Sequence, residues 1–353
     1  MRIANIMLGK KLGGIERSSI DYALGQRHMG NDVYMISDPD AAINHELTQT
    51  NIPFQVFTNM GPWDPFAPSK LRSLLKHYPV DCIIAHGSRA ITFAAKAKGD
   101  AKVIAVSHNY RFCSALAEAD AIFAVTRDMV EKLIAYGISE DKIIEVPNMI
   151  TLDHGFIRRT WNQKPVIGTL GRFEKKKGFD LFIEALRLLR DREIPFQAVL
   201  GGAGEEETNL RHQVARHDLE NFVSFPGWIE DPRAFLKTVD IFCLPSRHEP
   251  FGIVLLEAMA AKLPIVATDS EGPREILKNG ESGILVPRNQ PEALAGALQT
   301  MISQEDEARE MARHAYDTVK TRYSMEFVSQ RIDLVLREVC GMIPINHAEA
   351  LDS

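Results

Sequence analysis

The hydrophobic positions of this chain form short apolar runs that alternate with longer segments of helical periodicity. In the first half, six runs have the length and composition of buried strands: Ile3–Leu8, Val33–Ser37, Cys82–Ala85, Val103–Ser107, Ala121–Val125 and Ile143–Val146. Helical patterns lie between several of them, at Ile15–Met29, Arg89–Ala97 and Asp128–Tyr136. Apolar strands that alternate with helices are typical of a parallel sheet covered on both faces, so the pattern predicts an α/β fold.

The second half repeats this alternation. Strands are predicted at Val166–Leu170, Gln197–Leu200, Val223–Phe225, Ile241–Leu244, Ile265–Ala267 and Ile284–Val286, with helices at Phe179–Arg190, Glu205–Arg216, Pro291–Ile302 and Glu305–Thr318. The stretch between the halves, Pro147 to Pro165, is polar and lacks periodicity. Because 353 residues suffice for two ordinary domains, we predict one over 1–160 and another over 161–323. A last helix, Met325–Val339, follows Ser324, a residue type that caps helix starts.

Composition narrows the class of protein. The net charge of −6 and the pI near 6.0 argue against nucleic acid as the main partner. The four cysteines are scattered and form no C-x-x-C pair, so we expect reduced thiols in a cytoplasmic protein. No run approaches about 18 apolar residues, the length of a membrane span. The first residues have the pattern of a strand rather than of a signal peptide.

One predicted helix, Lys70–Tyr78, is basic, with Lys70, Arg72 and Lys76 on it. An ordinary solvated face accounts for such charges. Peripheral contact with the acidic headgroups on the inner face of a membrane is a second interpretation, which the sequence leaves open.

The stretch Ser246–Ala260 carries the first candidate site. It follows the apolar run Asp240–Pro245 and turns into a helix. Pro250 suits the helix start, because its missing N–H would be unpaired there anyway. A helix N-terminus attracts anions through its free N–H groups, which here belong to Phe251, Gly252 and Ile253.

Two carboxylates bracket this end of the predicted helix. Glu249 precedes it, and Glu257 lies eight residues further on, about two helical turns inside. A surface loop before a core helix would show the same residues. The position after a strand favours a site, because open parallel sheets bind ligands at the carboxyl ends of their strands.

A basic loop, Gly171–Gly178, follows the first strand of the second half. Arg172 comes directly after the strand and Lys177 precedes the next helix. A guanidinium fork and a mobile ammonium group both suit a diphosphate. The alternative is a solvated loop, since lysine runs are common on surfaces.

Three further strand ends of the first half carry candidates. Gly14 belongs to a two-glycine turn after the first strand, which lets a ligand approach the backbone closely. That turn lacks the G-x-G-x-x-G pattern, so a dinucleotide site is disfavoured. His108 follows another strand, and His86 has an equivalent position from which it could face an acceptor. The pair Asp38 and Asp40 lacks further metal ligands, so we interpret it as turn chemistry and expect no metal.

These stretches resemble the motifs of retaining glycosyltransferases of the family 4 type, also called glycosyl transferases group 1. Glu249-Pro-Phe-Gly-x4-Glu257 resembles their E-x7-E signature, and Gly171-Arg172-x4-Lys177-Gly178 resembles their G-R-x4-K-G motif. The likeness is strong across Val166–Pro287 and weaker before Pro147. It implies the GT-B fold, in which two Rossmann-like domains face each other across a cleft and the last helix, here 324–341, packs back on the first domain.

The resemblance also implies a role for each candidate. Arg172 and Lys177 would hold the donor diphosphate, Glu257 the ribose and Glu249 the sugar hydroxyls. Further donor contacts are implied for Gly14, His108, Trp228 and Ile229, the last two near the base. The loop Asp269–Glu275 departs from the family, because Glu271 stands where a small glycine is common.

The expected activity is therefore transfer of a sugar, with a hexosyl group as the first expectation, from a nucleotide-diphospho-sugar to an acceptor. The resemblance implies retention of configuration, no metal and no cofactor. The expected acceptor is an envelope glycan, a lipid-linked glycan or a glycolipid. Two alternatives remain: a nucleotide-sugar epimerase of similar fold and a non-catalytic module that binds a nucleotide-sugar. The E-x7-E pair argues against the first, and the presence of Arg172, Lys177 and both glutamates argues against the second.

Overall fold

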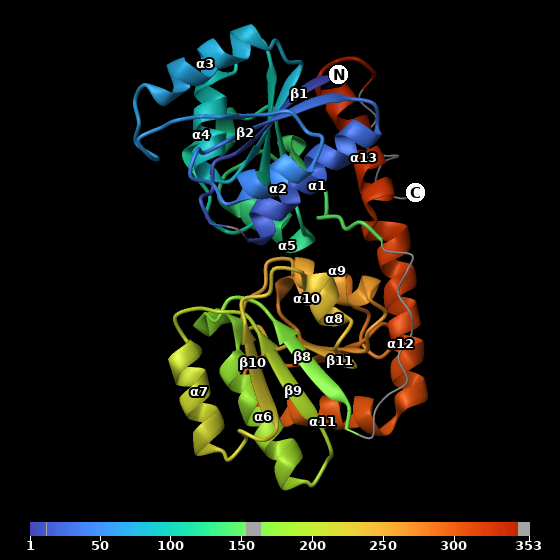
Figure 1. The fold of residues 1–353 in the computed structure, drawn as a ribbon. Helices are drawn as coiled ribbons and strands as arrows, with labels where there is room; N and C mark the ends of the chain where they lie inside the picture. The colour runs from blue at the N-terminus through green and yellow to red at the C-terminus, as the bar shows by residue number, and fades with distance from the viewer. Residues whose placement is uncertain (12, 153–163, 345–353) are drawn as a thin grey trace. The chain divides into compact units, whose positions relative to one another are not determined.

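The computed structural model describes residues 1–11, 13–152 and 164–344. The chain divides into two compact units (Figure 1), one made of Met1–Met149 and the chain from Ser324 onward, the other of Ile150–Tyr323. The domain boundary predicted at 160/161 lies outside the described residues. Each unit is built on one parallel sheet, and the predicted α/β class is confirmed.

The first unit has a seven-stranded sheet in the order β3-β2-β1-β4-β5-β6-β7. The strands are β1 (Arg2–Met7), β2 (Asp32–Ser37), β3 (Phe54–Val56), β4 (Cys82–His86), β5 (Lys102–Ser107), β6 (Ala121–Ala124) and β7 (Ile143–Glu145). Its helices are α1 (Gly14–His28), α2 (Ile43–Gln49), α3 (Ala67–His77), α4 (Ser88–Ala97), α5 (Arg127–Ala135) and α13 (Met325–Val339), with a 3-10 turn at Ser114–Glu118. The order reverses between β1 and β4, so the loops after these two strands diverge at that point.

Helix α13 packs against α1 although the two are far apart in sequence. The hydroxyl of Ser324 caps α13 by accepting a hydrogen bond from the N–H of Phe327 at 3.3 Å, as the sequence predicted. Gln26 on α1 donates to the carbonyl of Ser329 at 3.1 Å. A Cβ atom on Gly25 would lie 2.0 Å from the Ser329 hydroxyl, so the glycine permits this close helix contact.

The second unit has a six-stranded sheet in the order β10-β9-β8-β11-β12-β13. The strands are β8 (Val166–Leu170), β9 (Gln197–Gly201), β10 (Val223–Gly227), β11 (Ile241–Leu244), β12 (Ile265–Thr268) and β13 (Ile284–Val286). The helices are α6 (Phe179–Asp191), α7 (Glu207–Arg216), α8 (Pro232–Leu236), α9 (Ile253–Ala260), α10 (Glu271–Ile276), α11 (Pro291–Ser303) and α12 (Glu305–Thr318), with a 3-10 turn at Lys175–Lys177 and a π-helical turn at Val319–Tyr323. The order reverses between β8 and β11.

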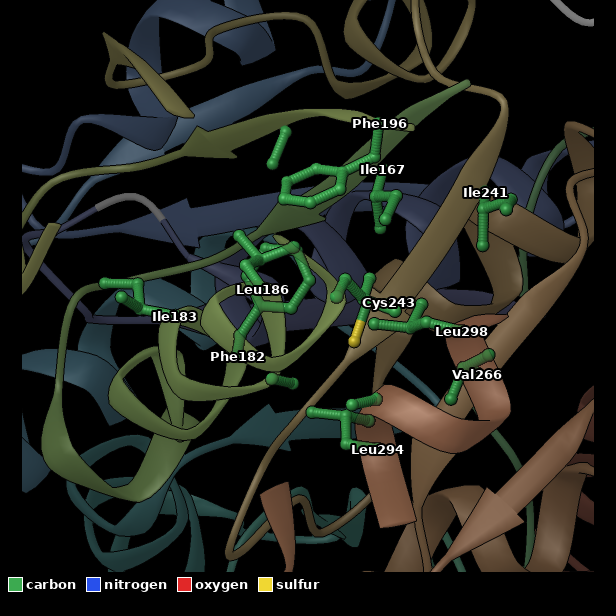
Figure 2. Packing of buried hydrophobic residues seen from close by; sticks show 14 of the residues in the cluster. Ile167, Phe182, Ile183, Leu186, Phe196, Ile241, Cys243, Val266, Leu294 and Leu298 are labelled. Carbon is green, nitrogen blue, oxygen red and sulfur yellow. The ribbon is translucent and has the colours of Figure 1, made fainter. Parts of the chain in front are cut away.

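The core of the second unit lies between its sheet and helices α6 and α11. Figure 2 shows Phe182, Leu186 and Leu298 from these helices close to Ile167 and Cys243 on the central strands. All five side chains are fully buried. This packing positions the carboxyl ends of β8 and β11 side by side, which is where the candidate residues of the basic loop and of the E-x7-E stretch lie.

No helix among the described residues is long and apolar enough to cross a membrane.

Candidate active site

The two loops that leave β8 and β11 are joined by an ion pair. The ammonium group of Lys177 donates to Oε2 of Glu249 at 2.6 Å. Both side chains are largely buried, with exposed fractions of 21% and 8%. The hydroxyl of Ser246 also donates to this carboxylate, at 3.4 Å. The structure therefore brings a predicted diphosphate ligand and a predicted sugar contact directly together.

Backbone geometry lets these loops approach each other. Gly178 has a φ of 68°, and a Cβ atom there would lie 2.1 Å from the carbonyl oxygen of Pro245. The N–H of Arg247 donates to the carbonyl of Lys176 at 2.8 Å. The guanidinium of Arg247 makes a two-pronged contact with Asp180, at 2.7 Å on each prong. The basic loop is thus held in place rather than free in solvent.

Arg172 is the more accessible of the two predicted diphosphate ligands. Half of its side chain is exposed, and its guanidinium lies 3.1 Å from Glu174. Burial opposes ionisation of Glu174, but the hydrogen bond from Lys176 and the charge of Arg172 prevail and hold the pKa of Glu174 below its usual value. Glu174 therefore keeps a cationic cluster together at the end of β8.

Helix α9 starts later than its sequence predicted. Its first residue is Ile253, and Gly252 precedes it in the left-handed region with a φ of 96°. The expectation that Pro250 begins the helix is wrong, because the backbone before Gly252 forms a separate turn. A Cβ atom on Gly252 would lie 3.1 Å from the Glu249 side chain, so this turn folds Glu249 against the helix start. Phe251 is buried, with its ring 6.1 Å from that of Tyr323.

Glu271 supports this turn, a role that the sequence did not reveal. Its carboxylate accepts from the backbone N–H of Glu249 at 3.2 Å and from Arg288 at 3.2 Å, and it lies 3.3 Å from Nδ1 of His248. Burial opposes its ionisation, yet its own backbone N–H, the N–H of Glu249 and the contact with His248 hold the pKa of Glu271 low. The neighbouring N–H of Gly272 donates to the carbonyl of Glu249 at 2.8 Å. The sequence feature that set Glu271 apart was that it stands where the family commonly has a glycine.

Glu257 lies away from the ion pair, in the second turn of α9. It is half-buried and lines a hollow between α8 and α9, together with Thr151, Arg233 and Lys237. The predicted base contacts follow β10: Trp228 exposes 46% of its surface, and Ile229 packs near Gly201.

In the first unit, two candidate histidines form a buried pair. Nδ1 of His86 and Nε2 of His108 are 2.9 Å apart, and the rings stack with their centroids 5.2 Å apart. Burial lowers the pKa of His86 well below its usual value and that of His108 to about 4; Asn148, hydrogen-bonded to His108, partly opposes the latter shift. Both imidazoles are therefore neutral at neutral pH. Gly14, the first residue of α1, is exposed.

The described residues contain no group of three or more histidine, cysteine or acidic side chains arranged to hold a metal. Asp38 and Asp40 form a turn instead, in which the N–H of Asp40 donates to the Asp38 carboxylate at 3.1 Å. Asp38 is buried and faces the cations of Lys10 and Arg89, each at 3.6 Å.

Comparison with known families agrees with this arrangement in both units. The family model described as Glycosyl transferases group 1 matches residues 156–318. The model described as Glycosyltransferase Family 4 matches residues 12–154. The chain belongs to the group 1 glycosyltransferases. It is a transferase of GT-B type, and the resemblance of its motifs to those of the group 1 glycosyltransferases is confirmed.

Individual relatives of this glycosyltransferase include enzymes of envelope synthesis. The lipopolysaccharide core biosynthesis glycosyltransferase LpsE of Rhizobium meliloti is 26% identical over 335 residues, which cover 93% of this chain and 97% of that protein. The phosphatidyl-myo-inositol mannosyltransferase of Mycobacterium leprae is 33% identical over 204 residues, 56% of this chain and 54% of that protein.

A similar fold is known from crystal structures. Anabaena Alr3699/HepE, solved in complex with UDP and glucose, superposes with a TM-score of 0.84 at 23% identity, over 96% of this chain and 100% of that one. At this identity the likeness concerns the fold of the glycosyltransferase.

Proposed function

We propose that this glycosyltransferase moves a hexosyl group from a nucleotide-diphospho-sugar to a glycan or glycolipid acceptor of the cell envelope, on the cytoplasmic side, with retention of configuration. The cationic end of β8 supports the proposal most directly. Arg172 is half-exposed there, and Lys177 belongs to the same loop. Together they supply the positive charge that a leaving diphosphate needs as its bond to the sugar breaks.

The ion pair between Lys177 and Glu249 prepares both residues for the donor. Each side chain neutralises the other in a largely buried place. An incoming diphosphate competes for the ammonium group of Lys177. Glu249 can then accept hydrogen bonds from sugar hydroxyls, the role that the family resemblance assigns to it.

The N-terminus of α9 adds a second source of positive potential. Ile253 and Val254 begin this eight-residue helix, and the first N–H groups of a helix have no partner within it. The charge on the diphosphate is thus balanced by protein groups, so the proposed reaction needs neither metal nor cofactor. Glu271, which holds the turn before α9, would keep these groups aimed at one place.

The proposed chemical step keeps the sugar configuration. The acceptor oxygen attacks the anomeric carbon on the face from which the diphosphate leaves. The bond from this carbon to the diphosphate breaks while the bond to the acceptor forms, and the acceptor proton passes to the leaving phosphate oxygen. Glu257 would hold the ribose, and Trp228 and Ile229 would lie near the base. Gly14 and His108 would also contact the donor.

The names of the relatives suggest where the product belongs. LpsE acts in lipopolysaccharide core biosynthesis and the mycobacterial enzyme is named for a phosphatidyl-inositol acceptor, so an envelope glycan or glycolipid is the first acceptor class to try. HepE was solved with UDP, so uridine diphosphate sugars are the first donors to try.

The test is a transfer assay with uridine, guanosine and adenosine diphosphate sugars against free and lipid-linked glycans. Mass spectrometry detects the product, and NMR reads the anomeric configuration. Transfer with retention is expected. Inversion would contradict the proposed step. Binding without turnover on any acceptor would point to a non-catalytic module, and conversion of the donor without acceptor would point to an epimerase.

A further inference from the structure

Two cysteines from distant parts of the sequence meet at the amino end of the first sheet. Cys82 is the first residue of β4 and is fully buried. Cys340 directly follows α13 and is half-buried. The Sγ atom of Cys340 lies 3.9 Å from the carbonyl oxygen of Asp81, the residue before Cys82, and the two thiols are hydrogen-bonded to each other. Both cysteines are free thiols in this structure, and we call them the cysteine pair.

The sheet holds the first member of the cysteine pair in place. The N–H of Asp81 donates to the carbonyl of Arg2 at 2.9 Å, and the carbonyl of Asp81 accepts from the N–H of Lys102 at 3.1 Å. These bonds fix the start of β4 between β1 and β5. The side chain of Cys82 belongs to a buried cluster that also contains Leu336 of α13. The helix is therefore packed on the core that surrounds this sulfur.

The end of α13 holds the second member. The N–H of Gly341 donates to the carbonyl of Glu338 at 2.9 Å, and the N–H of Met342 donates to that of Arg337 at 2.9 Å. With the φ of 70° at Gly341, these two bonds form a Schellman motif, which ends the helix at Cys340. Rotation about the Cα–Cβ bond of Cys340 is then the movement that closes the thiol contact to the S–S distance of about 2.0 Å.

The two thiols differ in reactivity. The hydrogen bond from Cys82 and the charge of Lys102 lower the pKa of Cys340, although burial and the carboxylates of Asp81 and Asp120 oppose this. Donation of that hydrogen bond, together with burial, raises the pKa of Cys82 well above its usual value. The thiolate is the nucleophilic form of cysteine. Cys340 is therefore the sulfur that reacts first, and the buried Cys82 remains a thiol beside it.

We propose that the cysteine pair is an oxidation site, at which a peroxide converts Cys82 and Cys340 into a reversible disulfide. The Cys340 thiolate attacks one peroxide oxygen, the O–O bond breaks, and the sulfur becomes a sulfenic acid. The other oxygen leaves as hydroxide or alkoxide and takes a proton from water. The sulfur of Cys82 then attacks that of Cys340, so the S–S bond forms, the S–O bond breaks, and hydroxide leaves with the Cys82 proton as water.

The disulfide would join α13 to the centre of the first sheet. The two thiols give up two electrons to the peroxide, and a dithiol reductant can return them. Cys82 begins β4 whereas His86 ends it, so the cysteine pair lies at the opposite end of the strand from the candidate histidines. A cross-link between these distant residues restricts the unfolded chain and thereby stabilises the fold. The inference depends neither on the sugar donor nor on the acceptor.

The test is treatment of the reduced full chain with hydrogen peroxide, followed by peptide mapping under non-reducing conditions. We expect a peptide that links Cys82 to Cys340, two hydrogens lighter than its parts and released by dithiothreitol. The Tm of the oxidised chain should exceed that of the reduced chain by about 5–10 °C. Cys340→Ser should abolish both the link and the shift. In Cys82→Ala the sulfenic acid on Cys340 has no thiol to attack it, so dimedone should label Cys340 there.

A matched control removes another half-buried thiol of the same unit. The thiol of Cys113 donates to the carbonyl of Ser88 at 4.0 Å. Cys113→Ser should keep both the cross-linked peptide and the Tm shift. Oxidation of Cys340 without a link to Cys82 in the unaltered chain would overturn the proposal, and so would a chain that peroxide leaves with all thiols free. A Tm shift that persists in Cys340→Ser would assign the effect to another residue.

Discussion

The ammonium group of Lys177 and the carboxylate of Glu249 meet at 2.6 Å across the junction of β8 and β11. Removing one partner leaves the other charge largely buried and unpaired. We expect Lys177→Met to lower the free energy of unfolding by about 2 kcal/mol, below the range for a fully buried pair because Lys177 is 21% exposed. Adding Glu249→Gln should restore part of the loss. Urea denaturation of both single variants and the double variant measures this; strictly additive effects would show that the pair is not coupled.

The two glutamates of the E-x7-E stretch should affect different kinetic constants. Glu249 is proposed to contact the sugar, where charge develops as the bond breaks, so Glu249→Gln should mainly lower kcat. Glu257 is proposed to hold the ribose, which does not react, so Glu257→Gln should mainly raise the KM for the donor, by about tenfold for a lost charge-assisted hydrogen bond of about 1.5 kcal/mol. Steady-state kinetics with the identified donor decides. An unchanged kcat in Glu249→Gln, or an unchanged donor KM in Glu257→Gln, would reverse the assignment.

Binding of a nucleoside diphosphate should raise stability without any metal. At a hundredfold over the dissociation constant the gain is about 2.7 kcal/mol, or roughly 5–10 °C in Tm. EDTA should leave this shift unchanged, since the proposed phosphate ligands are Arg172, Lys177 and the N-terminus of α9. Thermal unfolding with and without EDTA is the measurement, and Arg172→Gln should reduce the shift. A shift that appears only with magnesium or manganese would contradict the metal-free proposal.

The close contact of the two loops makes Gly178 irreplaceable. Its φ of 68° and the Pro245 carbonyl, 2.1 Å from where a Cβ atom would lie, oppose any side chain. Gly178→Ala should cost about 3 kcal/mol or more, since the clash involves backbone on both sides. Gly296, inside α11 with nothing within 4 Å of its Cβ position, is the matched control. Gly296→Ala should stabilise the protein by about 0.5–1 kcal/mol. If urea denaturation showed equal effects of the two changes on the free energy of unfolding, Gly178 would not be constrained by its backbone and by Pro245 as described.

The paired histidines should make stability depend on pH. The pKa values of His86 and His108 are lowered in the fold, the latter to about 4, whereas an unfolded histidine titrates near 6.5. As pH falls from 6.5 toward 4, the unfolded chain binds protons that the folded chain does not. The free energy of unfolding should therefore fall, by up to about 1.4 kcal/mol per pH unit for each histidine.

Urea denaturation between pH 7 and 5 tests this, a range in which most carboxylates stay ionised. His86→Gln should have a shallower slope, because one of the two groups is gone. His45→Gln, at an exposed histidine on α2, should keep the original slope. Identical slopes in His86→Gln and the unaltered chain would show that the pair does not titrate in this way.

Elements that depend on neighbouring residues were predictable from the sequence. The alternation of apolar runs was enough to predict every strand of the second sheet and all strands of the first except the short edge strand β3, whose exposed residues lack an apolar run. The cap at Ser324 was predictable because it acts within one helical turn. The start of α9 was not predictable in this way. Pro250 obeys the local rule for a helix start, but the chain nearby is held by Gly272 and Glu271, which come from a later part of the sequence. Contacts with distant backbone prevailed over local preference at that point.

By itself, the sequence determined which chemical groups stand at the strand ends, among them Arg172, Lys177, Glu249 and His108, because strand periodicity and motif spacing are local properties. Only the tertiary structure decided how those groups are paired. Lys177 meets Glu249 across 72 residues, and His86 meets His108 across 22. Each pair joins the carboxyl ends of strands that became neighbours, β8 with β11 and β4 with β5. Strand order follows from how the helices pack over the whole sheet, and no short stretch of sequence contains that information.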